Sequence, residues 1–534
     1  MAQARTEPTK TKAAQPNVLE SFNPATGELI GTAEITPPDA VAAIAEETAR
    51  IQQGWALTPL AERLAIIRRA GQWVLANRDE LASKLTDENG KTILESLTME
   101  VFPIVDSFQW VASWGGRYLS PERIPNPQPY MKHKRHYFLF EPLGVVGIIS
   151  PWNYPFSIPA GEVALALAAG NAVLLKPSEY TPLIANEIAR AFEAGGLPRG
   201  VLRVLHGRGD TGAAICEAGA VKKIFFTGST GTGRKIMEAA ARQLKPVMLE
   251  LGGKDAAVVL ADADLGRAVG GTMWAGFANA GQTCAGIERV YVDRRIYDEF
   301  VERITDLARA IHPGDPRDPV TQVGPMNNEM QYDKVVELLA DAEAAGAELR
   351  TGGPVTLPGL NGRFIAPVVV TGVDHSMRIM REEIFGPVVP IMPFDSEDQA
   401  VALANDSRYG LGASVWTRDT ARGRLIGERL QAGMVWVNDH MYSHGIAQTP
   451  WGGVKESGTG VTHSKFGLYE MVDKRLLSVD GGRLPVPWWH PYDDLKQRGL
   501  AAVFEALYSP ELAEKARKLW DHRTDLRELL QRMR

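Results

Sequence analysis

Apolar runs of strand length alternate with segments of helix length over much of the chain. Between residues 143 and 253, strands are predicted in GVVGIIS, AVLLKP, VLRVLHG, KKIFFTG and VMLELGG. Strands that alternate with helices in this way predict a parallel, doubly wound sheet. In TPLIANEIARAFEAGG, Thr181 is expected at the N-cap of a helix and Gly195 at its end.

A second region follows the same rhythm over residues 254–447, with DAAVVL and RVYVD as strands on either side of a helix in LGRAVGGTMWAGFANAG. Earlier in the chain, ESFNPATGELIGTAEIT predicts a short strand pair, and helical segments follow it as far as the Pro-rich link SPERIPNPQP. The predicted fold class is α/β, with two doubly wound domains.

Segments outside these regions predict additional elements. Residues 131–142 (MKHKRHYFLFEP) and 471–482 are predicted as strands. In the C-terminal extension, residues 483–534, a helix is expected from Ser509 and Pro510 onward, and the apolar stripe along it must be covered. The members of this stripe are Leu512, Ala516, Leu519, Trp520, Leu526, Leu530 and Met533.

Either a membrane surface or another copy of the protein could cover this apolar stripe. The tryptophans at 488, 489 and 520 beside basic residues are compatible with a helix on a membrane surface. The extension holds ten Lys and Arg against eight Asp and Glu, a net charge of only +2, and the acids are interleaved with the bases. Docking on the protein's own oligomer is therefore favoured, and no membrane partner is expected.

Composition and charge narrow the function classes. The net charge of -6 and the lack of a basic block exclude a general nucleic-acid binder. The sequence contains no run of 18 apolar residues, so no membrane span is predicted. Two cysteines in 534 residues give neither a disulfide framework nor the spacing of a zinc site, so no metal is expected. The first 17 residues form a polar tail without the apolar core of a secretory signal, and a cytoplasmic location is expected.

The two cysteines have different surroundings. Cys216 lies on a predicted amphipathic helix and is expected in the core. Cys284, in NAGQTCAGIER (279–289), has small and polar neighbours that are expected to leave its sulfur accessible. Accessibility and a lowered pKa are what a nucleophilic thiolate requires. Cys284 is the candidate nucleophile.

Two motifs at strand ends could hold a nucleotide. FFTGSTGTGRKI, with Gly228 and Ser229, follows a strand and opens a helix, but its glycines do not match the common dinucleotide fingerprint. Its alternatives are a phosphate loop and an ordinary tight turn. LLKPSE offers Lys176 and Glu179 either as a ribose-binding pair or as a solvated surface pair.

Two polar residues near predicted strand ends could take part in catalysis. Glu250, in VMLELGGK, is either a ribose-binding acid or a general base whose pKa is raised in a partly apolar cleft. Asn153, in SPWNYPFSIP, is either a structural turn residue or an oxyanion-hole donor.

In combination the motifs resemble those of the aldehyde dehydrogenase superfamily. PWNYP, KPSE, FTGST, LELGGK, GQTC, EEIFGP and PWGGVKESG occur in the order typical of that family, and the likeness runs from about Asn17 to about Asp480. The resemblance implies a cofactor-binding domain of residues 18–130, 143–253 and 448–470, and a catalytic domain of residues 254–447. It also implies that strands 131–142 and 471–482 form a small oligomerisation element, in a homodimer or homotetramer.

The resemblance also implies roles for the candidate residues. Cys284 would attack the aldehyde, Asn153 and the backbone N–H of Cys284 would form the oxyanion hole, and Glu250 would activate the water that hydrolyses the thioester. Residues that would bind the cofactor are Trp152, Lys176, Glu179, Gly228, Ser229, Glu383 and Phe385. The expected cofactor is NAD, with NADP as the alternative, because a carboxylate at Glu179 would repel a 2′-phosphate.

The sequence departs from the family pattern at one position. Some relatives carry an acid shortly after the position of Gly460, thought to help move the hydrolytic proton, whereas Val461 and Thr462 follow it here.

A cysteine hydrolase would need a histidine beside Cys284, and none lies in a segment that obviously returns to the thiol. A CoA-dependent acylating enzyme would not need Glu250, and an inactive scaffold would not need Cys284.

The substrate is expected to be a small, uncharged aldehyde. NDHMYSHGIAQ (438–448) should line the mouth of the substrate tunnel, and it holds no arginine that would bind a second carboxylate. Aliphatic or aromatic aldehydes are therefore favoured over semialdehydes.

Overall fold

The computed structural model describes residues 17–128, 131–482, 486 and 488–532, so the predicted N-terminal tail lies almost wholly outside the described residues. The chain divides into two compact units. One comprises residues 1–120 and 140–473, and the other comprises residues 121–139 and 474–534.

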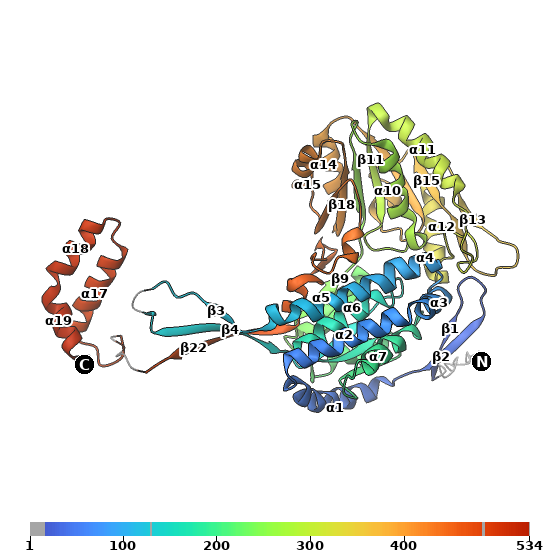
Figure 1. Cartoon of the computed structure of the whole chain (residues 1–534). Helices are drawn as coiled ribbons and strands as arrows, with labels where there is room; N and C mark the ends of the chain where they lie inside the picture. Colours follow the sequence, from blue (N-terminus) through green and yellow to red (C-terminus); the bar gives the residue numbers. More distant parts are fainter. Residues whose placement is uncertain (1–16, 129–130, 483–485, 487, 533–534) are drawn as a thin grey trace, which may run out of the picture. The chain divides into compact units, whose positions relative to one another are not determined.

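The larger unit contains two large sheets, which the labels β9 and β11 mark in Figure 1. The first sheet has six strands in the order β21-β9-β8-β5-β6-β7. All neighbours are parallel except β21, which pairs antiparallel with β9. The doubly wound sheet predicted from residues 143–253 is confirmed. Its strands are β5 (Val145–Ile149), β6 (Ala172–Lys176), β7 (Leu202–Val204), β8 (Val221–Thr227), β9 (Val247–Glu250) and β21 (Gly458–Thr459).

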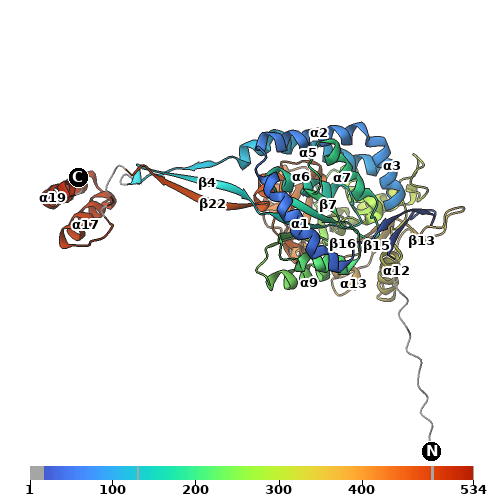
Figure 2. The same ribbon diagram turned by 90° about the horizontal axis from the view of Figure 1, so that it is seen from below.

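Helices cover both faces of this sheet. On one face lie α6 (Ser157–Ala169) and α7 (Ile184–Ala194), with α2 (Leu60–Ala76) and α5 (Phe102–Leu119) packed over them, as Figure 2 shows. The strand order reverses direction between β5 and β8, so right-handed crossovers place α8 (Gly209–Glu217) and α9 (Thr230–Ala241) on the other face. Cys216, on α8, is buried in this core as predicted.

The start of α7 was predicted wrongly. The helix begins at Ile184 rather than just after Thr181, and the carboxylate of Glu88 accepts hydrogen bonds from the backbone N–H groups of Leu183 (2.7 Å) and Ile184 (2.8 Å). A side chain from α3 (Arg78–Asn89), far away in the sequence, therefore caps the helix, and no local pattern indicates this. The predicted end at Gly195 is confirmed.

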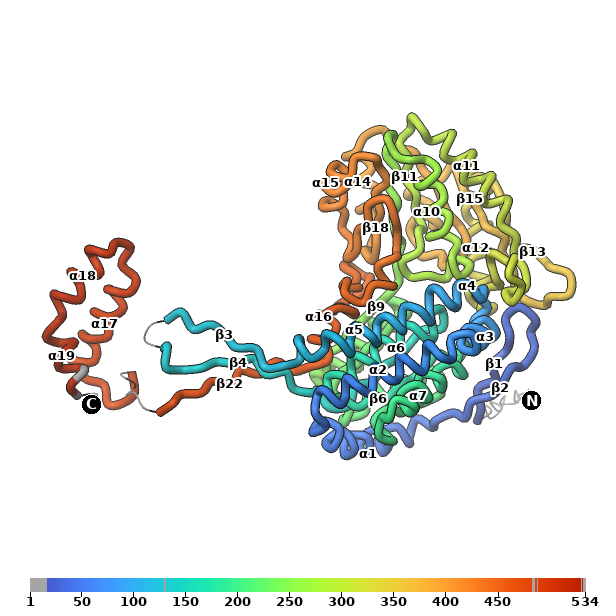
Figure 3. The backbone as a smooth tube through the Cα atoms, viewed as in Figure 1, coloured from blue at the N-terminus to red at the C-terminus, as the bar shows by residue number. Residues whose placement is uncertain are grey.

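The second large sheet has seven strands in the order β12-β15-β16-β11-β10-β18-β19, all parallel except for the β12-β15 pair. Helices α10 (Leu265–Phe277), α11 (Tyr297–Ala310), α12 (Glu329–Ala344), α14 (Glu397–Asn405) and α15 (Thr420–Gly427) surround it (Figure 3). Its strands are β10 (Asp255–Val259), β11 (Ile287–Asp293), β12 (Glu348–Leu349), β15 (Val368–Thr371), β16 (Val388–Phe394), β18 (Gly412–Trp416) and β19 (Met434–Val437).

The predicted motifs lie at the carboxyl ends of strands in the first sheet and directly before strands in the second sheet. In the first sheet, Trp152 follows β5, Lys176 ends β6, Gly228 follows β8 and Glu250 ends β9, all at carboxyl ends of strands. In the second sheet, the segment with Cys284 comes before β11, and residues 383–385 come before β16. The crevice between β5 and β8, where the strand order reverses, is the usual position of a ligand in such sheets.

Smaller elements complete the larger unit. β1 (Val18–Phe22) and β2 (Leu29–Glu34) form the predicted strand pair. The other elements are α1 (Pro38–Ala56), α4 (Ile93–Glu95), η1 (Ser96–Val101), η3 (Ala278–Gly281), η4 (Arg294–Ile296), β13 (Gly353–Val355), β14 (Phe364–Ala366), α13 (Arg378–Arg381), β17 (Tyr409–Gly410), η5 (Tyr442–Gly445), β20 (Val454–Lys455) and α16 (Ser464–Glu470).

The third sheet has the order β22-β4-β3, and β3 (Glu122–Ile124) pairs antiparallel with β4. β4 (Lys134–Pro142) and β22 (Val472–Asp480) are the two strands predicted outside the α/β regions. The C-terminal extension is helical, as expected, with α17 (Asp494–Tyr508), α18 (Leu512–Asp521) and α19 (Arg523–Arg532). Within the described residues, no helix is long and apolar enough to cross a membrane.

The prediction of one continuous helix from Ser509 was wrong in two respects. His522 ends α18, and α17 was not predicted. Packing between helices uses Leu529, which is 4% exposed, and Gly499, where a Cβ atom would lie 2.7 Å from the Leu529 side chain. In contrast, Leu512 and Trp520 of the predicted stripe are 85% and 67% exposed, so the extension itself does not cover them. Met533 and the Leu530 side chain lie outside the described residues.

Candidate active site

Cys284 follows a turn of unusual backbone geometry. It comes after α10 and η3 and before β11, as the sequence predicted. Asn279, Ala280 and Gly281 in η3 have φ angles of 54°, 53° and 69°, in the left-handed region that side chains disfavour. A Cβ atom on Gly281 would lie 2.1 Å from the carbonyl oxygen of Gly386, so glycine is required there. The turn is held in one strained conformation directly ahead of the thiol.

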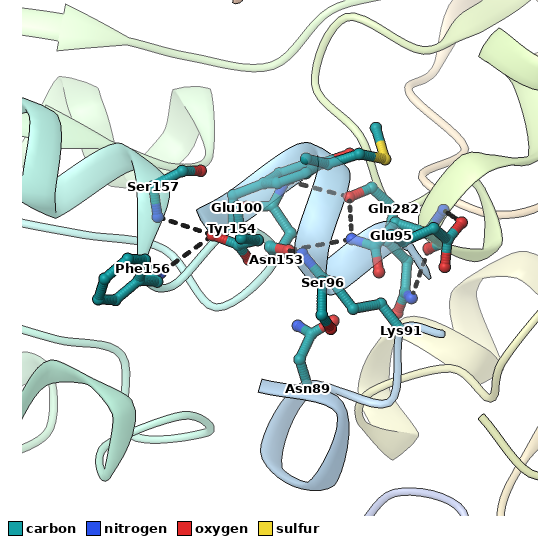
Figure 4. Close-up of polar contacts among 12 residues, drawn as sticks. Asn89, Lys91, Glu95, Ser96, Glu100, Asn153, Tyr154, Phe156, Ser157 and Gln282 are labelled. Atoms are coloured by element: carbon teal, nitrogen blue, oxygen red, sulfur yellow. Dashed lines mark hydrogen bonds and ion pairs between the residues drawn. The ribbon is translucent and has the colours of Figure 1, made fainter. Parts of the chain in front are cut away.

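Side chains from the segment after β5 bind this turn, as Figure 4 shows in part. The Asn153 amide Nδ2 donates to the carbonyl oxygen of Gln282 at 3.0 Å, and the Tyr154 hydroxyl lies 2.8 Å from Thr283 Oγ1. Asn153 is 3% exposed. The predicted oxyanion donor is therefore fixed two residues from the thiol along the chain, and its amide group carries a second N–H.

A buried ion pair supports Asn153 from behind. Lys91 Nζ donates to the Asn153 carbonyl oxygen at 2.8 Å and to Glu100 Oε1 at 2.6 Å, and both charged side chains are fully buried. Glu100 Oε2 in turn accepts from the N–H groups of Phe156 (3.2 Å) and Ser157 (2.7 Å), as drawn in Figure 4. The sequence analysis missed this pair, because DENGKTILESLTMEV contains nothing that marks Lys91 and Glu100 as buried.

Cys284 opens into a cavity of about 250 Å³ that also contains Glu250. The segment 438–448, predicted at the mouth of the tunnel, contributes Met441, Tyr442, His444 and Gly445. Within the part of the chain that the structure describes, the residues lining this cavity include no lysine and no arginine. Its other lining residues are Thr98, Met99, Pro103, Tyr154, Ile158, Glu162, Thr227, Trp274, Thr283, Trp451, Thr462 and His463.

Two unpaired acids face this cavity. Glu250 is 5% exposed and Glu162, on α6, is 3% exposed, and none of their carboxyl oxygens has a hydrogen-bond partner within the described chain. Burial, and secondarily the charge of Glu162, raises the pKa of Glu250 well above its ordinary value, in the predicted direction. Burial raises the pKa of Glu162 to about 8. The sequence analysis missed Glu162, although it is the single charged residue in the apolar segment SIPAGEVALALAA.

The expectation of an accessible thiol with a lowered pKa was wrong for this state of the protein. The Cys284 side chain is only partly accessible. Burial raises the pKa of the thiol, and the carboxyl groups of Glu250, Asp255 and Glu383 raise it further. The thiol is therefore protonated at neutral pH until a base or a nearby positive charge favours the thiolate.

Histidines lie closer to the thiol than the sequence indicated. His444 and His463 line the same cavity as Cys284, with ring centroids 5.0 Å apart, and His440 Nε2 lies 2.9 Å from the carbonyl oxygen of Ala285. Burial lowers the pKa of His444 to about 4 and that of His463 to about 3. Both are neutral, weakly basic side chains at neutral pH, so they are poor bases for a cysteine hydrolase.

The residues predicted to lie beside the nicotinamide contact one another or the neighbouring backbone. Trp152 and Phe385 meet edge to face, with ring centroids 5.5 Å apart, and Glu383 Oε1 accepts from the N–H of Gly253 at 3.0 Å. The Glu288 carboxylate accepts from the N–H of Phe385 at 2.7 Å and pairs with Lys254. Glu288 was missed, although GQTCAGIER includes it; its only signal is a charge at the start of an apolar strand.

The predicted ribose and diphosphate positions fit a dinucleotide. Lys176 is buried and its Nζ lies 3.2 Å from Glu179 Oε2, whereas the Glu179 side chain is 36% exposed, so only the lysine of this pair is removed from solvent. Ser229 is the N-cap of the 12-residue helix α9, directly after Gly228. The N–H groups and dipole at a helix N-terminus favour a bound diphosphate. No cluster of three or more potential metal ligands occurs among the described residues.

Comparisons with known proteins agree with this geometry. A sequence model of the aldehyde dehydrogenase family matches residues 10–476. A betaine aldehyde dehydrogenase of Sinorhizobium fredii is 38% identical over 88% of this chain and 96% of its own length. A probable NADP-type succinate-semialdehyde dehydrogenase of the same organism is 38% identical over 89% of this chain and 95% of its own length.

Solved structures show the same fold. A Staphylococcus aureus betaine aldehyde dehydrogenase variant, in complex with NAD+, has a TM-score of 0.84 at 32% identity and covers 90% of this chain and 98% of its own. A Bacillus cereus aldehyde dehydrogenase in complex with NAD+ has a TM-score of 0.83 at 34% identity and covers 87% and 93% of the two chains.

Proposed function

The chain belongs to the aldehyde dehydrogenase family, and we propose that it oxidises uncharged aliphatic or aromatic aldehydes to carboxylic acids through a covalent intermediate on Cys284. The supporting observation is the single cavity that contains both Cys284 and Glu250 and is lined by mostly apolar and aromatic side chains. A nucleophile and a general base in one largely apolar cavity are what acylation followed by hydrolysis requires.

Acylation begins when the Cys284 thiol releases its proton to water, the thiolate sulfur bonds to the aldehyde carbon and the carbonyl oxygen becomes an alkoxide. The second N–H of the Asn153 amide and the backbone N–H of Cys284 would stabilise this alkoxide, and the hydrogen bond from Asn153 to Gln282 supports this role. When bound, the nicotinamide of NAD would accept the hydride that leaves the former aldehyde carbon, which leaves a thioester on Cys284. Trp152, Phe385 and Glu383 would hold the ring and its ribose.

Hydrolysis of the thioester depends on Glu250. Its ionised carboxylate takes a proton from water while the water oxygen bonds to the acyl carbon, and Cys284 leaves as the thiolate. Since the pKa of Glu250 is raised, the fraction of ionised base grows as the pH rises through that pKa, and hydrolysis should be faster at alkaline pH.

NAD is the proposed cofactor, with NADP as the alternative. Lys176 and Glu179 would bind the adenosine ribose, and Gly228 and Ser229 would meet the diphosphate at the start of α9. The Glu179 carboxylate favours a free 2′-hydroxyl over a 2′-phosphate. We propose a cytoplasmic location because Cys216 and Cys284 both remain as free thiols.

A panel of aldehydes tests the proposed substrate class. Uncharged aromatic and aliphatic aldehydes should give the highest kcat/KM, because the cavity lining offers no cation for a carboxylate, and the raised pKa values of its two acids weaken its attraction for a quaternary ammonium. Reduced nicotinamide absorbance is the measurement. A clear preference for succinic semialdehyde or for betaine aldehyde would contradict the proposal, and no reduction with any aldehyde would contradict the oxidation itself.

We further propose a homodimer or homotetramer in which β4 and β22 take part and the extension covers another copy. Leu476 and Val479 of β22 are 60% and 45% exposed, and Trp520 of the extension is 67% exposed. Chains ending at residue 482 should keep aldehyde-dependent hydride release while losing thermal stability, oligomer size or substrate selectivity. Light scattering of both proteins is the measurement. A monomeric full-length protein, or its co-sedimentation with anionic liposomes at physiological salt, would contradict this assignment.

A further inference from the structure

Glu162 is a costly residue at its position. It lies on α6, between buried apolar residues, and the helix packs against α5, α2, β5, β6, α16 and η1. Its carboxyl oxygens face the cavity and have no partner among the described side chains. A buried carboxyl group without hydrogen bonds costs several kcal/mol of solvation, and such groups are concentrated at functional sites.

The groups around Glu162 offer it no compensating cation. The other titratable groups of the cavity are Cys284, Glu250, Tyr154, Tyr442, His444 and His463, and burial keeps the two histidines neutral. Glu100 of η1 faces the start of α6, where it binds the N–H groups of Phe156 and Ser157 and pairs with Lys91. The positive charge near this region is thus neutralised by Glu100.

The two cavity acids, Glu162 and Glu250, interact through their charges. The charge of Glu162 is the cause, after burial, that raises the pKa of Glu250. Two carboxyl groups that share one cavity cannot both ionise easily, so one carboxylate stabilises a proton on the other. Val461 and Thr462 supply no acid near this cavity, and Thr462 lines it with a hydroxyl group.

We propose that Glu162 accepts the hydrolytic proton from Glu250, so that the two carboxyl groups act as one proton-sharing pair during thioester hydrolysis. This inference rests on the proposed function. Water forms a bond to the acyl carbon, one of its O–H bonds breaks, and Glu250 takes that proton. The C–S bond then breaks, its electron pair returns to the Cys284 sulfur, and the carboxylic acid leaves. Before hydrolysis the pair carries one proton, on Glu162. Glu162 releases that proton to solvent, and Glu250 then passes the proton that it took from water to the Glu162 carboxylate, directly or through a cavity water.

Glu162→Gln tests the role of this positioning residue. The variant should retain a burst of about one reduced nicotinamide per active site, while steady-state kcat at alkaline pH falls by about 10²-fold, the usual scale for an acid–base group. Removal of the Glu162 charge should also lower the pKa of Glu250, so the ascending limb of the kcat–pH profile should move to lower pH. A purely structural role would not move that limb.

Glu193→Gln, at an exposed position on α7, is the matched control and should behave like the unaltered protein. An unchanged pH profile and an unchanged alkaline rate in Glu162→Gln would overturn the inference, and so would loss of the burst. If Glu162→Gln does not fold, infrared titration of the carboxyl bands answers the question: Glu250→Gln should move the Glu162 titration to lower pH, and no movement would overturn the pair. Absence of any burst in the unaltered protein would instead refute the proposed function.

Discussion

Cys284→Ala should abolish aldehyde oxidation, with a fall in turnover on the order of 10⁶-fold, because Cys284 is the only thiol among the described residues that line the cavity. Nicotinamide reduction should lose its burst as well as its steady state. NAD binding, followed by quenching of protein fluorescence, should persist, since the thiol is not among the groups expected to hold the cofactor. Residual turnover within about 10²-fold of the unaltered protein would refute covalent catalysis by this residue.

The turnover of Cys284→Ala can be compared with that of two other variants. Cys216→Ala removes the second thiol, which lies in the core of the first sheet, and should leave turnover intact while lowering the free energy of unfolding modestly. Asn153→Ala removes the proposed oxyanion donor and should lower kcat by about 10²–10³-fold. The order Cys284→Ala, Asn153→Ala, Cys216→Ala from most to least impaired distinguishes bond formation from charge stabilisation and from packing.

Glu250→Gln should separate the two halves of the reaction. Acylation needs the Cys284 thiolate, the oxyanion donors and the hydride acceptor but no base that activates water, so the variant should release about one reduced nicotinamide per active site and then stall at the thioester. Steady-state turnover should fall by about 10²–10⁴-fold, the range expected for loss of a general base. Rapid-mixing absorbance measures the burst, and mass spectrometry should detect the acyl group on Cys284.

Glu238→Gln, on the exposed side of α9, serves as the control for an amide substitution in the same domain. If Glu250→Gln weakened NAD binding and kept an unchanged burst rate at saturating cofactor, Glu250 would be a ribose ligand, which was the alternative reading of its position after the glycine loop. If the burst itself were lost, Glu250 would be the base that deprotonates Cys284, whose pKa is also raised by burial.

The α/β fold could be predicted because its strands are marked locally. Each apolar run between residues 143 and 253 is bounded by turns, and each became a strand of the first sheet. The prediction was wrong where distant contacts decide the outcome. Glu88 determines the start of α7 from another helix, and Leu529 of α19 packs against Gly499 of α17, which lies 30 residues away in the sequence.

The site was predictable in its rare motifs and unpredictable in its electrostatics. Cys284, Glu250 and Asn153 stand in recognisable strings. Cys284 and Glu250 line one cavity, and Asn153 binds the turn that precedes Cys284. Burial was the missing information. The raised pKa of Cys284 and the unpaired carboxyl of Glu162 follow from desolvation by residues that are far away in the sequence.

The late return of the chain to its first sheet has a consequence for biosynthesis. Glu250 lies on β9, whose outer neighbour β21 (Gly458–Thr459) is made only after the whole second sheet. At about 5–20 residues per second, the roughly 200 intervening residues take on the order of 10–40 s to translate. Throughout that interval β9 is an open edge strand on the nascent chain, exposed to pairing with other chains. His463, which also lines the cavity, follows β21, so the residues that line the cavity around Cys284 are all present only near the end of translation.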